Sequence, residues 1–277
     1  VMWSIGNEIP EQWSARGVEI AKRLQGLCHQ LDPSRPVTQG MDRVDAALKS
    51  GFAQAMDVPG FNYRLHKYKK GIEQLPQGFL LGSETASTVS SRGVYKFPVV
   101  VSDKATYPDG QCSGYDTEYC PWSNLPDDDW QMQDDNPWVI GEFVWTGYDY
   151  LGEPTPYDGY WPSRSSYFGI CDLAGLPKDR YYLYRSHWNK DSHTVHLLPH
   201  WTWPGREGEV TPVYCYTDGE SAELFVNGKS QGRVRKNKDS RLDRYRLRWN
   251  EVKYEPGEIR VVAYDADGNK IGEDMRR

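Results

Sequence analysis

Short apolar runs alternate with helix-like segments up to about residue 190 of this chain. The apolar runs begin near residues 1, 36, 55, 78 and 137. Between them, residues 14–31, 65–75 and 179–188 are predicted to form helices, with a weaker helix at 44–50. Strands that alternate with helices form parallel sheets with right-handed crossovers. Because eight such units close a barrel, five predict a partial (β/α)8 TIM barrel, about strands four to eight, cut from a larger protein.

The pattern changes at about residue 194. Five strand-like segments follow, separated by turn sequences such as Asn227-Gly228, and they lie at 195–198, 210–216, 222–226, 245–249 and 259–264. Short strands at this spacing are typical of an all-β immunoglobulin-like sandwich. The sequence therefore predicts two domains, a partial barrel at 1–192 and a sandwich at 193–277.

Chemically useful side chains stand where the predicted parallel strands end. Asn7 and Glu8 follow the first apolar run, and Tyr63, Glu84 and Trp145 close later ones. The C-terminal ends of barrel strands meet at one face, where catalytic residues gather. Two carboxylates across a sugar-binding cleft supply the acid/base and the nucleophile of glycoside hydrolysis. Each residue also has a structural alternative, as a helix cap or a packed aromatic.

Composition narrows the kind of partner. The chain has 11 Trp and 19 Tyr, rings that suit wet surfaces stacked against sugars, although an aromatic-rich core would look the same. A net charge of -6 argues against nucleic acid, and the basic cluster at 233–238 is predicted to be a solvated hairpin tip. No segment approaches the roughly 18 apolar residues of a membrane span. Residues 85–136 have no clear periodicity, which predicts either a cleft-lining loop or a surface insertion.

Several of these segments together resemble one known family. They occur in family order at 1–8, 57–63, 82–85, 141–145 and 168–172, and residues 223–229 resemble the sandwich that follows. The chain is similar over nearly its whole length to the family 2 glycoside hydrolases, in particular to their β-galactosidase branch. The resemblance covers the later half of the catalytic barrel and the immunoglobulin-like domain after it.

The resemblance implies a role for each residue at the strand ends. Glu8 matches the acid/base of the family and Glu84 its nucleophile. Asn7 matches a residue that hydrogen-bonds the 2-hydroxyl of the sugar, Tyr63 a tyrosine that hydrogen-bonds the nucleophile, and Trp145 an aromatic wall of the sugar subsite. Asp149 and Glu153 lie in the loop after Trp145 and are weaker candidates for substrate contact.

The expected activity is that of a retaining exo-β-glycosidase, first of all a β-galactosidase. A β-glucuronidase or β-mannosidase of the same family is the alternative, as is a catalytically silent carbohydrate-binding fragment. No cofactor is expected. Some family members place a histidine shortly after the nucleophile and use a divalent metal, whereas Ser87 stands in that region here, so this segment does not support a metal. Open strand edges predict possible self-association, and a periplasmic or secreted setting would suit polysaccharide degradation.

Overall fold

The computed structural model describes residues 1–160 and 165–277. The chain divides into two compact units, which are taken one at a time: residues 1–87 with 121–145, and residues 88–120 with 146–277. No helix in the described part of the chain is long and apolar enough to cross a membrane.

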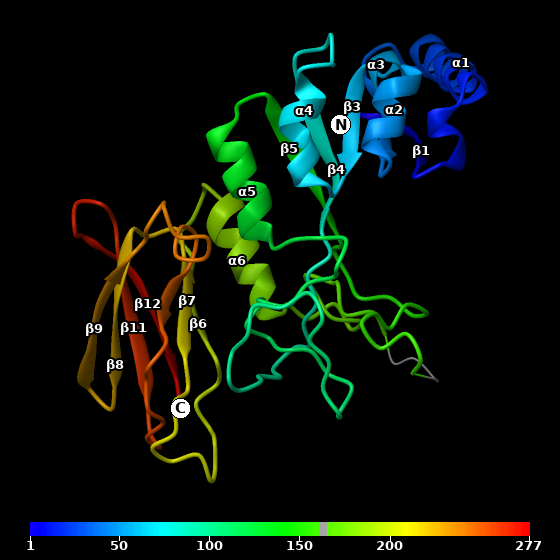
Figure 1. Cartoon of the computed structure of the whole chain (residues 1–277). Helices are drawn as coiled ribbons and strands as arrows, with labels where there is room; N and C mark the ends of the chain where they lie inside the picture. The colour runs from blue at the N-terminus through cyan, green and yellow to red at the C-terminus, as the bar shows by residue number, and fades with distance from the viewer. Residues whose placement is uncertain (161–164) are drawn as a thin grey trace. The chain divides into compact units, whose positions relative to one another are not determined.

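The first unit is built on a parallel sheet whose strands follow one another in chain order (Figure 1). These strands are β1 (Trp3–Asn7), β2 (Val37–Met41), β3 (Val58–Asn62), β4 (Leu80–Ala86) and β5 (Val139–Trp145). Every neighbouring pair is parallel. The prediction of an α/β parallel sheet is therefore confirmed.

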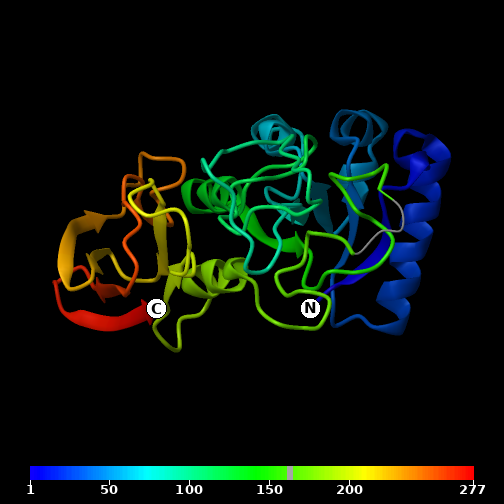
Figure 2. The same cartoon turned by 90° about the horizontal axis from the view of Figure 1, so that it is seen from below.

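Helices connect these strands and cover part of the sheet. They are η1 (Pro10–Trp13), α1 (Ala15–Leu31), α2 (Val44–Ser50), α3 (Phe52–Ala55), η2 (Leu65–Lys67), α4 (Tyr68–Ile72) and α5 (Pro126–Asp135). The side chain of Ser14 caps α1 by accepting a hydrogen bond from the Gly17 amide at 3.0 Å. Figure 2 shows α1 running alongside β1 at the edge of this unit. A core cluster that includes Phe52, Phe61 and Tyr68 lies between the helices and the sheet.

Three predicted elements differ in detail from the structure. The strand predicted from residue 55 begins at Val58, because residues 52–55 form the short helix α3. The helix predicted at 65–75 is two short pieces, η2 and α4. Within 85–136, where the sequence indicated no regular element, Pro126 begins the ten-residue helix α5, with three aspartates in its first turn.

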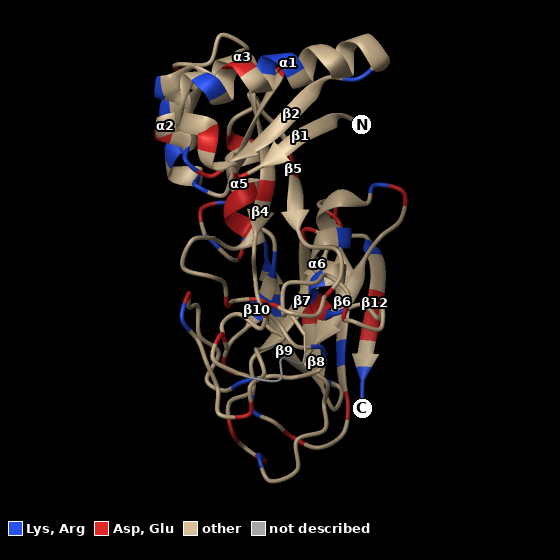
Figure 3. Ribbon diagram, turned by 90° about the vertical axis from the view of Figure 1, so that its right-hand side faces the viewer, with Lys and Arg blue, Asp and Glu red and all other residues tan. Residues whose placement is uncertain are grey.

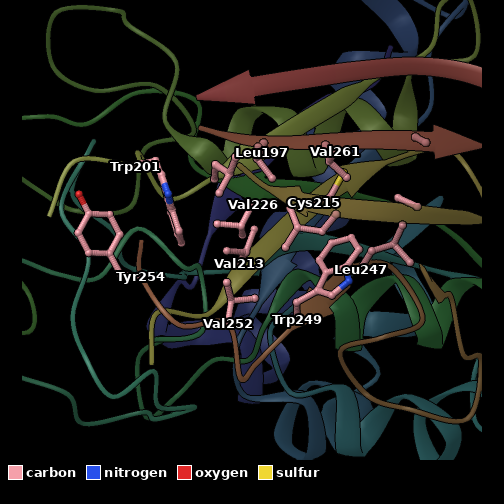
Figure 4. Close-up of a cluster of buried hydrophobic side chains, with 14 residues drawn as sticks. Leu197, Trp201, Val213, Cys215, Val226, Leu247, Trp249, Val252, Tyr254 and Val261 are labelled. Carbon is pink, nitrogen blue, oxygen red and sulfur yellow. The ribbon is translucent and has the colours of Figure 1, made fainter. Parts of the chain in front are cut away.

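The second unit contains a helix, α6 (Asp179–Trp188), and two antiparallel sheets. The strand order is β10-β7-β6 in one sheet and β12-β11-β8-β9 in the other. The strands are β6 (Val195–Leu198), β7 (Val213–Thr217), β8 (Ser221–Val226), β9 (Lys229–Arg235), β10 (Leu247–Trp249), β11 (Ile259–Tyr264) and β12 (Lys270–Arg276). Side chains such as Leu197, Val213 and Val261 from the two sheets meet in one core (Figure 4). The prediction of an antiparallel sandwich is confirmed.

Charged side chains follow the edges of this sandwich. Arg233 and Arg235 lie within the edge strand β9, so the prediction that 233–238 is a hairpin tip was wrong for its first residues. Charged edge strands discourage pairing with other chains. Lys and Arg are interspersed with Asp and Glu along the other edge strand, β12, and the same is true of α1 in the first unit (Figure 3).

Candidate functional site

The parallel strands bring the predicted pair of glutamates into one hydrogen-bonded network. Glu8 directly follows β1, and its amide donates to the Gly40 carbonyl at 2.9 Å. Glu84 lies near the end of β4, where its carbonyl accepts the Tyr63 amide at 2.8 Å. Glu8 is exposed and Glu84 half-buried. Both carboxylates therefore stand at the same C-terminal edge of the sheet.

Asn62, the last residue of β3, joins the two carboxylates. Its Nδ2 donates to Glu8 Oε1 at 2.9 Å and to Asn7 Oδ1 at 2.8 Å, and lies 3.4 Å from Glu84 Oε2. Its Oδ1 accepts the Ser83 hydroxyl at 2.7 Å. Because an amide nitrogen is a donor and the amide oxygen an acceptor, this set of partners fixes the orientation of the side chain. Asn62 is fully buried.

Tyr63 provides a second contact to Glu84. Its hydroxyl donates to Glu84 Oε1 at 2.7 Å and lies 2.6 Å from the Ser87 hydroxyl. Burial, followed by the charge of Glu84, raises the pKa of Tyr63 far above its usual value. The phenol therefore stays protonated and remains a hydrogen-bond donor to the carboxylate.

The backbone is strained around these side chains. Positive φ angles occur at Glu8 (48°), Tyr63 (53°), Ala86 (70°) and Ser87 (46°). Residues other than glycine pay a conformational cost in this region, and such residues persist where the surrounding structure over-determines them. The strain is concentrated at the ends of β1, β3 and β4, where the polar side chains converge.

Gly40 in β2 leaves the space that the network occupies. A Cβ atom at this position would lie 2.4 Å from Asn7 Oδ1 and 2.6 Å from Asn62 Oδ1. Both distances are too short for any real contact, so a larger residue would displace the Asn7 and Asn62 amides, and Asn62 is the residue that contacts both carboxylates.

Trp145 ends β5 at the same edge of the sheet. In the strand ladder it pairs with Ala86, two residues after Glu84, and it is half-buried. Four strands thus bring the five predicted residues to one edge of the sheet. Asn7 and Glu8 lie at the end of β1, and the ends of β3, β4 and β5 carry Tyr63, Glu84 and Trp145.

A further carboxylate lies beside the strand that carries Glu84. Glu142 in β5 accepts the Thr85 hydroxyl at 2.6 Å and the indole N–H of Trp130, in α5, at 2.8 Å. Asp129, also in α5, is 2% exposed and accepts the Asn124 amide at 2.6 Å. Burial raises the pKa of both carboxyl groups. The half-buried Glu142 thus bonds β4 at Thr85, the residue after Glu84, and the buried Asp129 lies in the helix beside it.

The loop carboxylates have different surroundings. Asp149 is buried, and it accepts the Lys178 ammonium and the Gly169 amide, each at 2.7 Å. Glu153 accepts the Tyr150 hydroxyl. Within residues 1–160 and 165–277, no group of three or more His, Cys, Asp or Glu side chains is arranged to hold a metal ion.

Sequence reasoning missed Asn62, Ser83 and Glu142. Asn62 directly precedes Tyr63 in the strand that carried the resemblance, which was the available signal. Ser83 directly precedes Glu84, and Glu142 lies within the segment 141–145. No spacing rule distinguishes either residue from other polar residues in strands.

Curated proteins match nearly the whole chain. It is 38% identical to a β-galactosidase of Bacteroides ovatus over 96% of this chain and 35% of that protein. It is 30% identical to a putative β-glucuronidase of Formosa agariphila over 95% of this chain and 26% of that protein. The chain thus spans about a third or less of these curated relatives.

Solved structures agree in fold. A β-glycosidase from Bacteroides vulgatus matches 100% of this chain and 36% of that chain, with a TM-score of 0.76 and 32% identity. A family 2 glycosyl hydrolase member from Bacteroides cellulosilyticus matches 100% of this chain and 33% of that chain, with a TM-score of 0.69 and 28% identity. In the second unit, residues 208–272 match a family model described as a domain of unknown function, DUF4982.

Proposed function

Because the chain belongs to the family 2 glycoside hydrolases, we propose that the protein is a retaining exo-β-glycosidase acting on terminal β-galactosides. The five-stranded sheet then forms about strands four to eight of a (β/α)8 barrel at 1–192, followed by the immunoglobulin-like sandwich at 193–277. The β-galactosidase of Bacteroides ovatus supports galactose as the sugar.

The contact of one amide with both glutamates carries this proposal. Asn62 Nδ2 lies 2.9 Å from Glu8 Oε1 and 3.4 Å from Glu84 Oε2, so these two oxygens are at most about 6.3 Å apart. Retaining glycosidases hold their carboxyl groups roughly 5–5.5 Å apart, and inverting ones roughly 6.5–9.5 Å. A single donor that contacts both carboxylates keeps the pair close together, which favours the shorter, retaining separation and supports a double displacement.

The two carboxylates have separate roles in the proposed reaction. Glu84 attacks the anomeric carbon while Glu8 donates a proton to the departing oxygen, so that the glycosidic bond breaks as the glycosyl–Glu84 bond forms. Glu8 then takes a proton from water, whose oxygen replaces Glu84 at the anomeric carbon. Tyr63 donates to Glu84 at 2.7 Å and stabilises the charge that returns to it. Asn7 and Trp145 contact the sugar.

Covalent trapping tests the assignment. Full-length protein treated with a 2-fluoro-β-galactoside should carry the adduct on Glu84, located by peptide mass spectrometry. Glu84→Gln should abolish labelling, while the matched substitution Glu142→Gln, in the next strand, should still be labelled. An adduct on any residue other than Glu84 would overturn the proposed nucleophile.

A β-glucuronidase is the second candidate, because a relative of 30% identity carries that name. A panel of aryl β-galactoside, β-glucuronide and β-mannoside substrates separates the possibilities. The highest kcat/KM on the galactoside supports the first proposal, whereas preference for the glucuronide would reassign the sugar and keep the two carboxylate roles.

A further inference from the structure

Residues 88–120 follow β4, the strand that carries Glu84, and they contain one half of a buried ion pair, Asp116 with Arg180. Asp116 Oδ1 accepts the guanidinium of Arg180 at 3.1 Å, and neither side chain is more than 1% exposed. Asp116 also has a positive φ of 55°. Such a conformation at a buried residue persists only when its neighbours determine it closely.

We call the ion pair of Asp116 and Arg180 the anchor. Arg180, in α6, also bonds the first residues of the segment 88–120. Its Nη1 donates to the carbonyls of Thr88 and Phe168, and its Nη2 donates to the Ser90 hydroxyl at 2.8 Å. A guanidinium holds several acceptors in a fixed plane, so these bonds define the position of the Thr88 carbonyl.

The matched region 208–272 supplies contacts to the other side of the anchor. The Tyr216 hydroxyl, from β7, lies 3.3 Å from Asp116 Oδ2 and 3.1 Å from the Tyr115 carbonyl. The buried Arg246 donates to that same carbonyl at 3.0 Å, and the Tyr115 hydroxyl donates to the Pro212 carbonyl. Three residues of the region thus fix residues 115 and 116.

We propose that the region 208–272 is a positioning domain, which holds Asp116 and Arg180 and thereby fixes Thr88 and the residue bonded to it, Ser87. The Ser87 hydroxyl lies 2.6 Å from the Tyr63 hydroxyl, which in turn donates to Glu84. The strained φ of 46° at Ser87 requires such support from its neighbours. The consequence for catalysis rests on the proposed function of Tyr63 and Glu84.

Removal of one hydroxyl tests the anchor. In the full-length protein, Tyr216→Phe deletes the contacts to Asp116 and Tyr115 and keeps the ring. The matched control is Tyr254→Phe, which deletes a buried hydroxyl of the same region that meets the Trp203 amide at 3.1 Å. Both variants lose one buried tyrosine hydroxyl, and only the first touches the anchor.

Hydrogen exchange gives a readout that needs no activity. Tyr216→Phe should speed amide exchange of a peptide covering residues 85–90 by roughly threefold to tenfold, the equivalent of one hydrogen bond. Tyr254→Phe should leave that peptide unchanged. Equal exchange in the two variants would overturn the positioning role, even in an active enzyme.

A double-mutant cycle tests the route to the nucleophile. Tyr216→Phe should slow release of the trapped 2-fluoroglycosyl group from Glu84 more than Tyr254→Phe does. In a Tyr63→Phe background the same substitution should have no further effect, because the contact that it acts through is gone. Additive effects would show that the domain does not act through Tyr63. A wild-type protein that never forms the adduct would refute the proposed function, while the exchange result would still decide the anchor.

Discussion

Asn62 donates a hydrogen bond to Glu8 at 2.9 Å from a position where no part of its own side chain is exposed to solvent. A buried amide between two carboxylates orients both and offsets part of their repulsion. The positions of the two carboxylates therefore depend on Asn62 as well as on the strands that carry them.

Asn62→Ala should lower kcat/KM on the preferred aryl glycoside by roughly 10- to 1,000-fold, because it removes one or two hydrogen bonds to charged groups. Asn124→Ala is the matched control, since Asn124 also donates to a carboxylate, Asp129, at 2.6 Å. It should cost stability with a much smaller loss of kcat/KM. Similar losses of activity in the two variants would remove the special role of Asn62.

Gly40→Ala should impair catalysis through the same network. The added methyl group would lie 2.4 Å from Asn7 Oδ1 and 2.6 Å from Asn62 Oδ1, so both amides must move, which disturbs the bonds of Asn62 to Glu8 and Glu84. Steady-state kinetics should show a lower kcat, together with a free energy of unfolding lowered by about 1–3 kcal/mol.

Gly26→Ala provides the control for that substitution. Gly26 lies inside α1, and a Cβ atom there meets nothing within 4 Å. This variant should leave kcat unchanged and stabilise the protein by about 0.5–1 kcal/mol, the helix preference of alanine over glycine. If Gly40→Ala behaved like Gly26→Ala, the close approach at Gly40 would be refuted.

The elements that the sequence predicted well are those with a repeated apolar pattern. The runs before Glu8 and Glu84 are parallel strands, β4 mostly buried and β1 exposed to half-buried at the edge of the sheet, and the helix at 179–188 is α6. Because parallel strands end at one edge, the meeting of Glu8, Tyr63 and Glu84 followed from the order of the elements.

The missed features lack such a pattern. Asn62, at the end of β3, contacts Asn7 and Glu8, at the end of β1, past Gly40 of the intervening strand β2, and no apolar pattern marks a contact between strands that are not neighbours. The edge strands β9 and β12 are mostly charged or polar, and the partly buried side chains that they pack against the core are Val234 and Ile271, so no apolar period marks them.

The ion pair of Lys178 with Asp149 should be essential to the second unit. Lys178 is 2% exposed, and its ammonium also meets the Ser90 carbonyl at 2.8 Å. Lys178→Met leaves the Asp149 charge buried and unpaired, so chemical denaturation should show a loss of about 3–5 kcal/mol. Adding Asp149→Asn should recover part of it. The exposed substitution Lys69→Met should change stability by less than about 0.5 kcal/mol.

The same lysine predicts a change with pH. Burial lowers the pKa of Lys178 to about 8, against 10.5 for the ordinary side chain. Between these values the unfolded chain holds the proton more tightly than the folded one, so the contribution of Lys178 makes the folded state more stable as pH rises from 8 to 10.5. Wild-type protein should show this rise relative to Lys178→Met in parallel denaturation series. A constant difference across that range would contradict the lowered pKa.

The carboxyl groups of the buried Asp129 and the half-buried Glu142 should make the first unit less stable as pH rises. Burial raises the pKa of both, and the charge of Glu142 raises that of Asp129 further. The folded state therefore holds protons that the unfolded chain releases near its ordinary values of 3.8 and 4.5. With the native state binding more protons, this contribution to the free energy of unfolding is fully present below those values and is lost as pH rises through the higher folded pKa values.

Asp129→Asn should remove much of this dependence. Among the described residues, Asp129 Oδ1 makes no hydrogen bond of good geometry, whereas Oδ2 accepts a hydrogen bond from the Asn124 amide. An asparagine can keep the second contact and carries no charge into the interior, so thermal unfolding at pH 8 should show a gain of about 1–2 kcal/mol, with little gain at pH 4. Asp134→Asn, at an exposed position of α5, should show no such pH-dependent gain. A loss of stability for Asp129→Asn at pH 8 would mean that the ionised carboxylate is favoured in the folded protein.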